Sequence, residues 1–411
     1  MASSAALLAG ELDRQNISQA AAPRDLRSGA AVFGLMLQDF RNYATLKLPS
    51  QGMPVVLTGP NGAGKTNILE ALSFLSPGRG LRRAKLGEVT RQTASGGRWA
   101  MHAELSSCIG PVSIGTGLVE TAGDEDSERR HVRINGEAAS SANALAEYLD
   151  IVWLTPQMDR LFVDGLSTRR RFMDRLVYGL DGGHARRVGA YEKAMRERNK
   201  LLKSGGADPS WLGALEGQMA EHGVAVAAAR RDGLTLVEAG MALSEASGDG
   251  AFPRGRLAAK GIVEDWLAEM PALAAEEKLR RLLQERRFID RDAGAATEGP
   301  HRSDFAVWHC AKDQAAAHCS TGEQKALLIA ITLANARLIR ERKGFAPLLL
   351  LDEVSAHLDA TRRAALYGEI LALGGQAWLT GTDLDLFKGL RERAEFFAVA
   401  DGAVMPQAAP A

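Results

Sequence analysis

The chain has 411 residues, of which 46% are hydrophobic and 24% are charged, as in an ordinary globular protein with a sizeable core. Lysine and arginine together number 50, as do aspartate and glutamate, so no overall positive field draws the chain onto nucleic acid and any such binding must rest on local patches. Three widely spaced cysteines argue against a disulfide framework or structural zinc and indicate a reducing, cytoplasmic setting. No apolar run is long enough to span a membrane.

Residues 1–30 are rich in alanine and serine, but they contain acidic residues and lack the apolar segment of a targeting peptide, so we expect a disordered extension. The chain then turns to short, strand-like segments, and Asn135-Gly136 after the last of them is a strong turn signal. The expected strands lie near residues 32–37, 43–48, 54–58, 99–105, 112–119 and 131–134. The predicted fold class is α/β, with a mixed sheet around one helix.

The third of these strands leads into GPNGAGKT, which has the spacing G-x-x-x-x-G-K-[ST] with Gly59, Gly64, Lys65 and Thr66 in its fixed places. Glycines let backbone N–H groups converge on phosphate oxygens, Lys65 supplies charge for the β and γ phosphates, and Thr66 offers an oxygen to Mg²⁺. The strand before the loop and the helical run after it favour a phosphate site over a chance glycine-rich turn.

From residue 165 to 296 the chain becomes rich in Arg, Glu, Ala and Leu at helical spacing. We expect helices near residues 184–203, 210–247 and 253–288, and heptads too irregular for a long coiled coil. The chain then returns to strands and helices. This pattern predicts a helical insertion at 165–296 within one discontinuous head formed by 31–164 and 297–411.

Two stretches of the second half complement the phosphate loop. The apolar run at 348–351 ends in Asp352 and Glu353, and a carboxylate pair at a strand end can hold Mg²⁺ and polarise a water molecule, although a strand ending in Asp-Glu is by itself a common structural event. In CSTGEQK, at 319–325, Ser320 and Glu323 have capping-box spacing before a helical run. A capped helix start is also an anion site.

Taken in order, GPNGAGKT, STGE, the 348–353 strand and the SAHLD segment at 355–359 resemble the Walker A, signature, Walker B and D-loop of ABC-type ATPases. In that superfamily two heads face each other head to tail. The resemblance therefore implies that Ser320 and Gly322 serve the ATP of a partner copy, with Asp359 in the D-loop. In its long insertion between the two halves, the chain resembles the DNA-repair branch of the superfamily, which includes Rad50 and SMC.

A more specific resemblance is to the RecF family of bacterial recombination mediators, and it extends over residues 33–383. It rests on five stretches: LQDFRNY at 37–43, GPNGAGKTNILEAL at 59–72, LTP with DRL at 154–161, RRRFMD at 169–174 and GPHRSD at 299–304. The resemblance implies catalytic roles for Lys65, Asp352 and Glu353. It also implies that Gln157 binds the nucleotide and its Mg²⁺. Further nucleotide-binding residues implied by the resemblance are Arg41, Asn61, Gly62 and Asn67.

The RecF resemblance implies ATP and Mg²⁺ as cofactors and a weak, DNA-stimulated ATPase that acts as a switch. It also implies an ATP-dependent homodimer on duplex DNA and gapped junctions, with RecO and RecR as partners in loading RecA. Two departures from the ABC pattern bear on hydrolysis. Glu323 stands where glutamine is usual, and residues 379–383 lack the switch histidine, so we expect slow turnover.

Local positive charge should mark the DNA surface. The loop at 78–85 contains Arg79, Arg82, Arg83 and Lys85 without an acidic residue, and we expect it to contact phosphates. Arg169-Arg170-Arg171 begins the insertion. The basic cluster at 196–203 is either a second DNA surface or a solvated helix face, and His301-Arg302 is either a structural turn or linked to DNA.

Two other classes of function stay open at this point. The chain could be the energy subunit of a transporter, with the insertion as a docking domain, or a tether of the SMC type. The Arg-rich loops disfavour the first, and the lack of sustained heptads disfavours the second.

Overall fold

The structure is a computed structural model that describes residues 29–94, 98–120, 128–205, 208–246, 251–356 and 358–411. It divides into two compact units, the first formed by Met1–Pro156 with Ile339–Ala411 and the second by Gln157–Leu338. Most of the predicted disordered extension, residues 1–28, lies outside the described residues. Ala30, at its end, is buried, and its N–H donates to the carbonyl of Ala346 at 2.9 Å.

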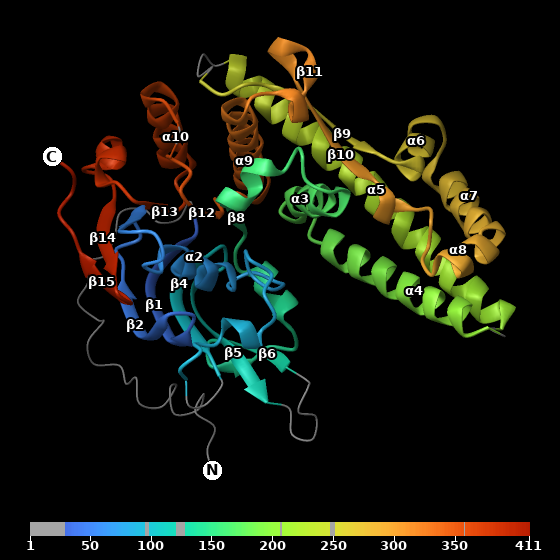
Figure 1. The fold of residues 1–411 in the computed structure, drawn as a ribbon, viewed down its shortest axis with the longest axis horizontal. Coiled ribbons are helices and arrows are strands. Elements are labelled where there is room, and N and C mark those ends of the chain that lie inside the picture. The colour runs from blue at the N-terminus through green and yellow to red at the C-terminus, as the bar shows by residue number, and fades with distance from the viewer. Residues whose placement is uncertain (1–28, 95–97, 121–127, 206–207, 247–250, 357) are drawn as a thin grey trace. The chain divides into compact units, whose positions relative to one another are not determined.

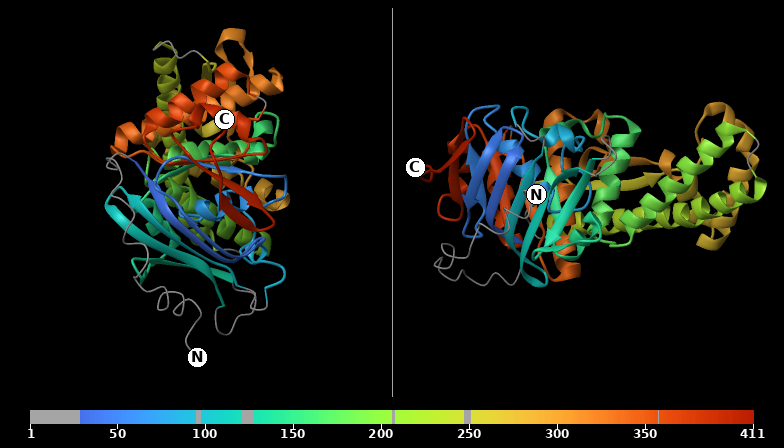
Figure 2. Two further views of the ribbon diagram at one scale, coloured as in Figure 1. Left: turned by 90° about the vertical axis from the view of Figure 1, so that its left-hand side faces the viewer. Right: turned by 90° about the horizontal axis from the view of Figure 1, so that it is seen from below.

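The first unit contains two six-stranded sheets (Figures 1 and 2). One is antiparallel, in the order β2-β1-β4-β5-β6-β7, and its strands are β1 (Ala31–Phe40), β2 (Tyr43–Pro49), β4 (Ala100–Ser107), β5 (Gly110–Glu120), β6 (Glu128–Ile134) and β7 (Glu137–Ala138). The predicted turn at Asn135 and Gly136 is confirmed, since both have positive φ, 53° and 85°, between β6 and β7.

The other sheet is mainly parallel, in the order β15-β14-β3-β13-β12-β8. Its strands are β3 (Val55–Thr58), β8 (Ile151–Leu154), β12 (Leu348–Leu351), β13 (Ala377–Gly381), β14 (Glu395–Ala400) and β15 (Ala403–Pro406). The α/β fold class is therefore confirmed, but the strands form two sheets rather than the single sheet we expected. Strands β3 and β12 are buried along their whole length, as central parallel strands require, whereas β4 alternates between buried and half-buried positions.

One helix, α2 (Lys65–Ser73), is enclosed in the core that both sheets share (Figure 1). Ile68, Leu69 and Leu72 are fully buried in the same cluster as Leu37 of β1 and Leu350 of β12. A second helix of this unit is α10 (Ala360–Leu373). Burial on all sides fixes the start of α2, and with it the end of the phosphate loop.

Arg130 of β6 neutralises the other end of α2. Its guanidinium donates to the carbonyl oxygens of Ser76 and Gly78, at 3.1 and 2.9 Å, and to that of Phe74. Burial lowers the pKa of this guanidinium to about 10. A cation at the carboxyl end of a helix complements the negative end of the helix dipole. The positive end of the same dipole, at the amino end of α2, favours an anion.

The second unit is helical with a small sheet, in the order β11-β10-β9. Its helices are α3 (Leu166–Tyr178), α4 (His184–Ser204), α5 (Pro209–Ala246), α6 (Ile262–Glu269), α7 (Ala272–Glu285), α8 (Arg287–Ala293) and the first part of α9 (Thr321–Lys343), and its strands are β9 (Gly255–Lys260), β10 (Asp304–His309) and β11 (Gln314–Ala315). Helices α4, α5 and α7 share one apolar core around Met219 and Leu279. No helix of the described part is long and apolar enough to cross a membrane.

The structure corrects the expected helix at 253–288, because Gly255–Lys260 is a strand. This segment pairs antiparallel with β10, and Leu257 lies opposite Val307. Leucine, alanine and lysine favour helices by intrinsic propensity, so only the distant pairing partner determines the strand. The same pairing places residues 304–309 in the second compact unit, which extends from Gln157 to Leu338 and contains the segment 165–296 that we predict to be the insertion.

Candidate nucleotide-binding site

The loop between β3 and α2 depends on glycines at fixed positions. Gly59, Gly62 and Gly64 have φ of 147°, 82° and 113°, values that other residues rarely adopt. A Cβ atom at Gly59 would lie 2.1 Å from the carbonyl oxygen of Val399, and one at Gly64 would lie 2.5 Å from Nδ2 of Asn42. Asn61 and Gly62 are exposed at the tip of the loop. The turn at its end leads directly into the amino end of α2, where backbone N–H groups lack partners within the helix.

Lys65 folds back over this loop. Its Nζ donates to the carbonyl oxygens of Gly59 at 2.7 Å and Pro60 at 2.9 Å, and the residue is 4% exposed. Burial lowers the pKa of the Lys65 ammonium, while the negative charges of Glu353 and Asp352 oppose this shift. The hydrogen bonds that hold the ammonium at the loop come from neutral carbonyls, which a phosphate can replace as a charged partner.

Thr66 and Asp352 meet at the ends of α2 and β12. The Thr66 hydroxyl donates to the Asp352 carboxylate, with Oγ1 lying 2.9 and 3.0 Å from its two oxygens. This arrangement leaves the hydroxyl lone pairs for a cation. A hydroxyl and one carboxylate fit Mg²⁺, which uses few protein ligands and completes its shell with phosphate and water. Among the described residues no group of three or more His, Cys, Asp or Glu side chains could hold a metal by themselves.

Glu353, the second carboxylate of the strand end, has an unusual backbone. Its φ is 50°, in the left-handed region. The Glu353 N–H donates to Oγ1 of Thr380 at 2.9 Å, and the Thr380 hydroxyl donates in turn to Oδ1 of Asp352 at 2.7 Å. Sequence reasoning missed Thr380. The available signal was one polar residue inside β13, the strand that pairs with β12.

Glu70, on α2, holds two arginines that the sequence assigned to ligands. Arg41 contacts it through Nε at 2.8 Å and Nη2 at 2.6 Å, and Arg82 through Nη1 at 2.8 Å. Glu70 is fully buried, so the two guanidiniums balance its charge inside the protein. Contacts of Arg41 with nucleotide and of Arg82 with DNA stay predictions, and in this structure both side chains support α2.

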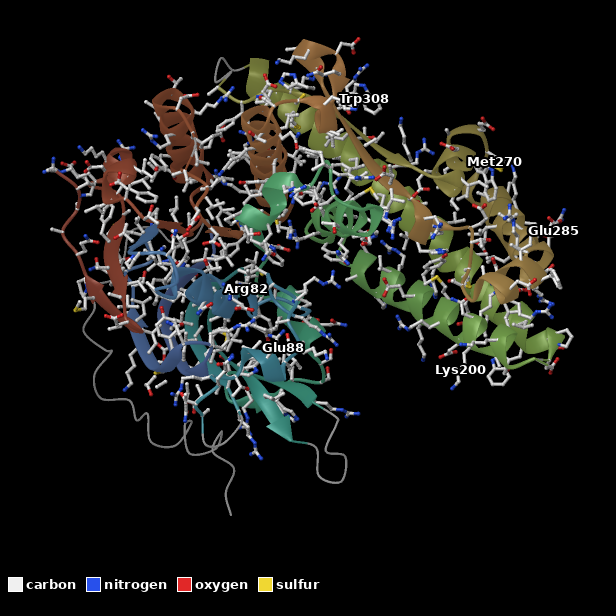
Figure 3. All side chains as sticks on the ribbon, viewed as in Figure 1. Arg82, Glu88, Lys200, Met270, Glu285 and Trp308 are labelled. Carbon is white, nitrogen blue, oxygen red and sulfur yellow. The ribbon has the colours of Figure 1, made fainter. Side chains whose placement is uncertain are left out.

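Asn42 and Asn67 connect this group to the loop. Arg82 also donates to Oδ1 of Asn67 at 2.6 Å, Asn67 donates to Oδ1 of Asn42 at 2.7 Å, and Asn42 donates to the carbonyl of Ala63 at 3.1 Å. We did not expect a role for Asn42. Figure 3 shows Arg82 beside α2. The other basic residues of its loop, Arg79, Arg83 and Lys85, are exposed.

The signature loop lies in the second unit, at the start of α9. Ser320, Thr321 and Gly322 are exposed, and the predicted capping box is present in part, because the Ser320 N–H donates to Oε2 of Glu323 at 3.0 Å. The other oxygen of Glu323 forms an ion pair with Lys312. Hydrogen bonds from Lys312 and from Ser320 lower the pKa of Glu323 to about 2. The extra negative charge at this position is therefore paired with Lys312, from the turn that precedes β11.

The functional roles of Asp359 and Gln157 stay predictions, and their structural surroundings are as follows. Asp359 caps α10, accepting from the N–H of Arg362 at 2.8 Å, and His357 of the same D-loop lies outside the described residues. Gln157 belongs to the second unit, in a short 3-10 turn over Pro156–Arg160. Lys325 of α9 forms an ion pair with Asp159 of this turn at 3.4 Å.

The RRRFMD and GPHRSD stretches pack against each other in the second unit. Arg169 forms an ion pair with Asp304 at 2.6 Å, and Arg170 donates to the carbonyl of Ser303 at 3.0 Å. His301 contacts the Tyr191 hydroxyl at 2.7 Å, and its other ring nitrogen contacts the carbonyl of Ala296 at 2.9 Å. These contacts support the structural interpretation of His301, while Arg302 beside it is exposed.

The basic cluster on α4 is divided between the interior and the surface. Arg198 is fully buried between Glu216 and Asp290, at 3.0 and 2.7 Å. Arg196 forms a helical i,i+4 pair with Glu192 at 3.6 Å, and both of these side chains are exposed (Figure 3 labels Lys200 on the same helix). This arrangement supports the solvated helix face over a second DNA surface.

Comparisons with known proteins identify the family of the chain. The model of the RecF/RecN/SMC N terminal domain matches residues 31–386. The DNA replication and repair protein RecF of Rhizobium etli (strain CFN 42) is 50% identical over 370 residues, covering 90% of this chain and 97% of the relative. The protein of that name from Brucella suis biovar 1 is 52% identical over 369 residues, covering 90% and 94%.

Solved structures support the fold. A structure described as the recombination mediator protein RecF-ATPrS in the RecFOR pathway has a TM-score of 0.78 at 23% identity, covering 93% of this chain and 99% of the other. An Smc head domain from Pyrococcus furiosus, bound to the C-terminal domain of ScpA, has a TM-score of 0.51 at 15% identity, covering 92% and 96%.

The two-sheet unit with its phosphate loop, the paired carboxylates after β12 and the signature helix define an ATPase head of the SMC type, within the ABC class. Within that class, the chain belongs to the RecF family of DNA replication and repair proteins. Family membership favours the DNA-repair interpretation over the transporter subunit.

Proposed function

We propose that the chain is an ATP-gated DNA-binding protein of recombinational repair. ATP joins two copies head to tail on duplex DNA beside a single-stranded gap, and slow hydrolysis separates them. One observation carries the proposal: the phosphate loop and the Walker B carboxylates are assembled within one unit, whereas Ser320, Thr321 and Gly322 are exposed at a capped helix start. An exposed helix start of this kind suits a phosphate held by another copy.

The chemistry assigned to the chain is hydrolysis of the γ-phosphate. The amino end of α2 and Lys65 bind the phosphates, and Thr66 and Asp352 would hold Mg²⁺, which supplies charge neutralisation for the phosphates. Glu353 accepts a proton from the attacking water. The water oxygen bonds to the γ-phosphorus as the bond to the β–γ bridging oxygen breaks, and ADP and inorganic phosphate leave.

ATP can drive association only if it binds the dimer more tightly than the monomer. Contact with both the cradle of one copy and the Ser320 loop of the other would supply that difference. Hydrolysis removes the γ-phosphate that the two surfaces share, so the dimer loses its bridge. The absence of a switch histidine at 379–383 is consistent with slow turnover.

The DNA contact is assigned to Arg79, Arg83 and Lys85, whose side chains reach the surface of the loop. Phosphate contacts from such side chains give salt-dependent, sequence-independent affinity. By family membership we also propose that the chain acts with RecO and RecR to load RecA at gaps, on chromosomal DNA in the cytoplasm. The structural neighbour at 23% identity is described as a recombination mediator in the RecFOR pathway, which is consistent with this assignment.

The test is the binding of purified protein to a fluorescent gapped duplex at one moderate salt concentration, with and without ATP. The expected result is tighter binding with ATP, accompanied by a doubling of the 43.9 kDa protomer mass. Equal, weak binding in both conditions would show that ATP does not control DNA binding. A fully paired duplex and a free single strand of the same length serve as matched controls for the preference for gaps.

A further inference from the structure

We infer that Thr380 is a positioning residue that holds both Walker B carboxylates, in a chain that lacks the switch histidine of this region. The inference deepens the proposed function and rests on its ATP-binding part. Thr380 lies in β13, is fully buried, and contacts the two consecutive residues that follow β12, Asp352 and Glu353. Nothing in the family resemblance pointed to this residue.

The directions of the two hydrogen bonds follow from the chemistry of their partners. A backbone N–H can only donate, so Oγ1 of Thr380 accepts from Glu353 at 2.9 Å. The single hydroxyl proton of Thr380 is then free to be given to Oδ1 of Asp352 at 2.7 Å. One side chain therefore fixes an acceptor on the metal-binding carboxylate and a donor on the backbone of the catalytic residue.

Each bond has a separate consequence. Thr66 donates to the same carboxylate from α2, so Asp352 is held between two hydroxyls and its orientation toward the proposed Mg²⁺ site is set. Glu353 adopts the left-handed backbone region at φ 50°, which disfavours a residue with a side chain. The bond from its N–H stabilises that conformation and thereby the direction in which the carboxylate leaves the backbone.

The parallel pairing of β12 and β13 explains why the Thr380 hydroxyl can form both hydrogen bonds. Leu351, the last residue of β12, lies opposite Leu379 of β13, so the residues that follow each of them, Asp352 and Thr380, fall at the same level. The backbone turns sharply immediately after Asp352, bringing the Glu353 N–H back to the same hydroxyl. A valine here would have nearly the same shape but could make neither bond.

The experiment compares Thr380→Val, Thr380→Ser and the control Thr332→Val. Thr332 is also buried, but its hydroxyl donates to the carbonyl of Leu328 within α9. For each protein we would measure thermal unfolding, kcat and KM for ATP, and the Mg²⁺ dependence of binding of a fluorescent ATP analogue, including binding in EDTA.

We expect Thr380→Val to lower kcat by about 10- to 100-fold and to raise the Mg²⁺ concentration for half-maximal binding by a similar factor, as for other partners of metal ligands. Binding in EDTA should change little, because the phosphate loop and Lys65 are untouched. Thr380→Ser should restore both quantities to within about threefold, since it keeps the hydroxyl. Wild-type values in the valine variant, or a serine variant as defective as valine, would overturn the inference.

A measurement on the wild-type protein keeps the inference testable if the valine variant does not fold. Hydrogen–deuterium exchange of the peptide that contains Glu353 should show a protected amide in the absence of nucleotide, and rapid exchange there would contradict the hydrogen bond to Thr380. The outcome is separable from that of the proposed function. Protein that binds ATP with Mg²⁺ but shows no ATP effect on DNA affinity would defeat the gating proposal and leave this test intact.

Discussion

The phosphate cradle of the first unit and the signature loop of the second unit are organised in opposite ways. In the cradle, Lys65, Asp352 and Thr380 are buried and each has partners within the chain. In the signature loop, Ser320 and Gly322 are exposed, and the charge of Glu323 is satisfied by Lys312 and the Ser320 N–H. The cradle side chains are thus held by partners within the chain, whereas the signature loop is exposed with its charge already balanced, which suits the contact with a second copy that we propose.

This difference explains which substitutions should be severe. A buried, hydrogen-bonded group leaves partners unsatisfied when it is removed, whereas removal of an exposed group affects only its interaction with a ligand or partner. Substitutions in the cradle should therefore affect ATP binding or turnover in each copy. Substitutions in the signature loop should leave ATP binding by one copy intact and affect only association.

Lys65→Ala should have the broadest effect, because it removes ATP binding and with it every step that depends on bound ATP. Loss of the ammonium should weaken ATP binding by at least about 100-fold, because the phosphates lose their charged partner in a buried site. Association with a second copy should be lost with it. Isothermal titration with ATP measures the first and sedimentation velocity the second. Lys47→Ala, an exposed lysine of β2, is the matched control. ATP affinity equal to that of the wild type would contradict the cradle assignment.

Glu353→Gln should separate binding from chemistry. The amide keeps the shape of the side chain but cannot accept the proton from water, so we expect kcat to fall by about 100- to 10,000-fold while ATP affinity stays near that of the wild type. The ATP-bound dimer should then persist. A phosphate-release assay with equilibrium ATP binding checks both quantities. Turnover at the wild-type rate would mean that a different residue activates the water.

The basic loop at 78–85 is predicted to bind DNA, and a triple substitution tests this role. Replacement of Arg79, Arg83 and Lys85 together by alanine should weaken DNA binding by about 10- to 100-fold at moderate salt. The salt slope should fall by about 0.9 for each DNA phosphate that the protein no longer neutralises. Arg196, Lys200 and Lys203, three basic residues of α4, provide a control triple of equal charge. If the two triples weaken binding equally, general charge rather than the loop is responsible.

Arg82→Ala should behave differently from its neighbours in that loop. Its guanidinium contacts Glu70 and Asn67 beside the cradle, so the substitution should reduce ATP affinity by about tenfold through displacement of α2, with DNA affinity in the absence of ATP little changed. Fluorescence titrations with an ATP analogue and with labelled duplex make the comparison. A loss confined to DNA binding would return Arg82 to the DNA surface.

Glu323→Gln should have the smallest effect. The pair with Lys312 lies near the surface, so we expect ATP-dependent association to change by less than about threefold. The pKa of Glu323 is lowered from 4.5 to about 2 in the folded protein. The ionised carboxylate therefore contributes fully to the free energy of unfolding above pH 4.5, and this contribution is lost only as the pH falls toward 2. Association measured across neutral pH should therefore run parallel in the variant and the wild type. Glu276→Gln, on α7 and remote from this loop in the sequence, is the control.

Much of the site could be predicted from the sequence because its residues stand next to each other in short stretches. The loop from Gly59 to Thr66 and the carboxylates after Leu351 are local patterns with chemical constraints on each position. The strands with alternating or continuous apolar residues were recognisable for the same reason. Neighbouring residues determined these features, and the fold preserved them.

The remainder depended on residues brought together from distant positions. Thr380 contacts Asp352 only because β13 pairs with β12, and Gly255–Lys260 becomes a strand only because β10 lies beside it. Arg82 and Arg198 resembled surface charges in the sequence, but Glu70 and Glu216 hold them inside or at the edge of the protein. No local pattern distinguishes such arginines from those on a solvated face.

The most direct test of the composite site is a mass measurement on Glu353→Gln with and without the added substitution Ser320→Arg, in the presence of ATP. Ser204→Arg, at an exposed position at the end of α4, replaces it in the control. We predict a doubling of the protomer mass for Glu353→Gln and for the control, and a single protomer for the variant that contains Ser320→Arg, with ATP bound in all three. A doubled mass in spite of Ser320→Arg would contradict the claim that the signature loop of one copy completes the nucleotide site of the other.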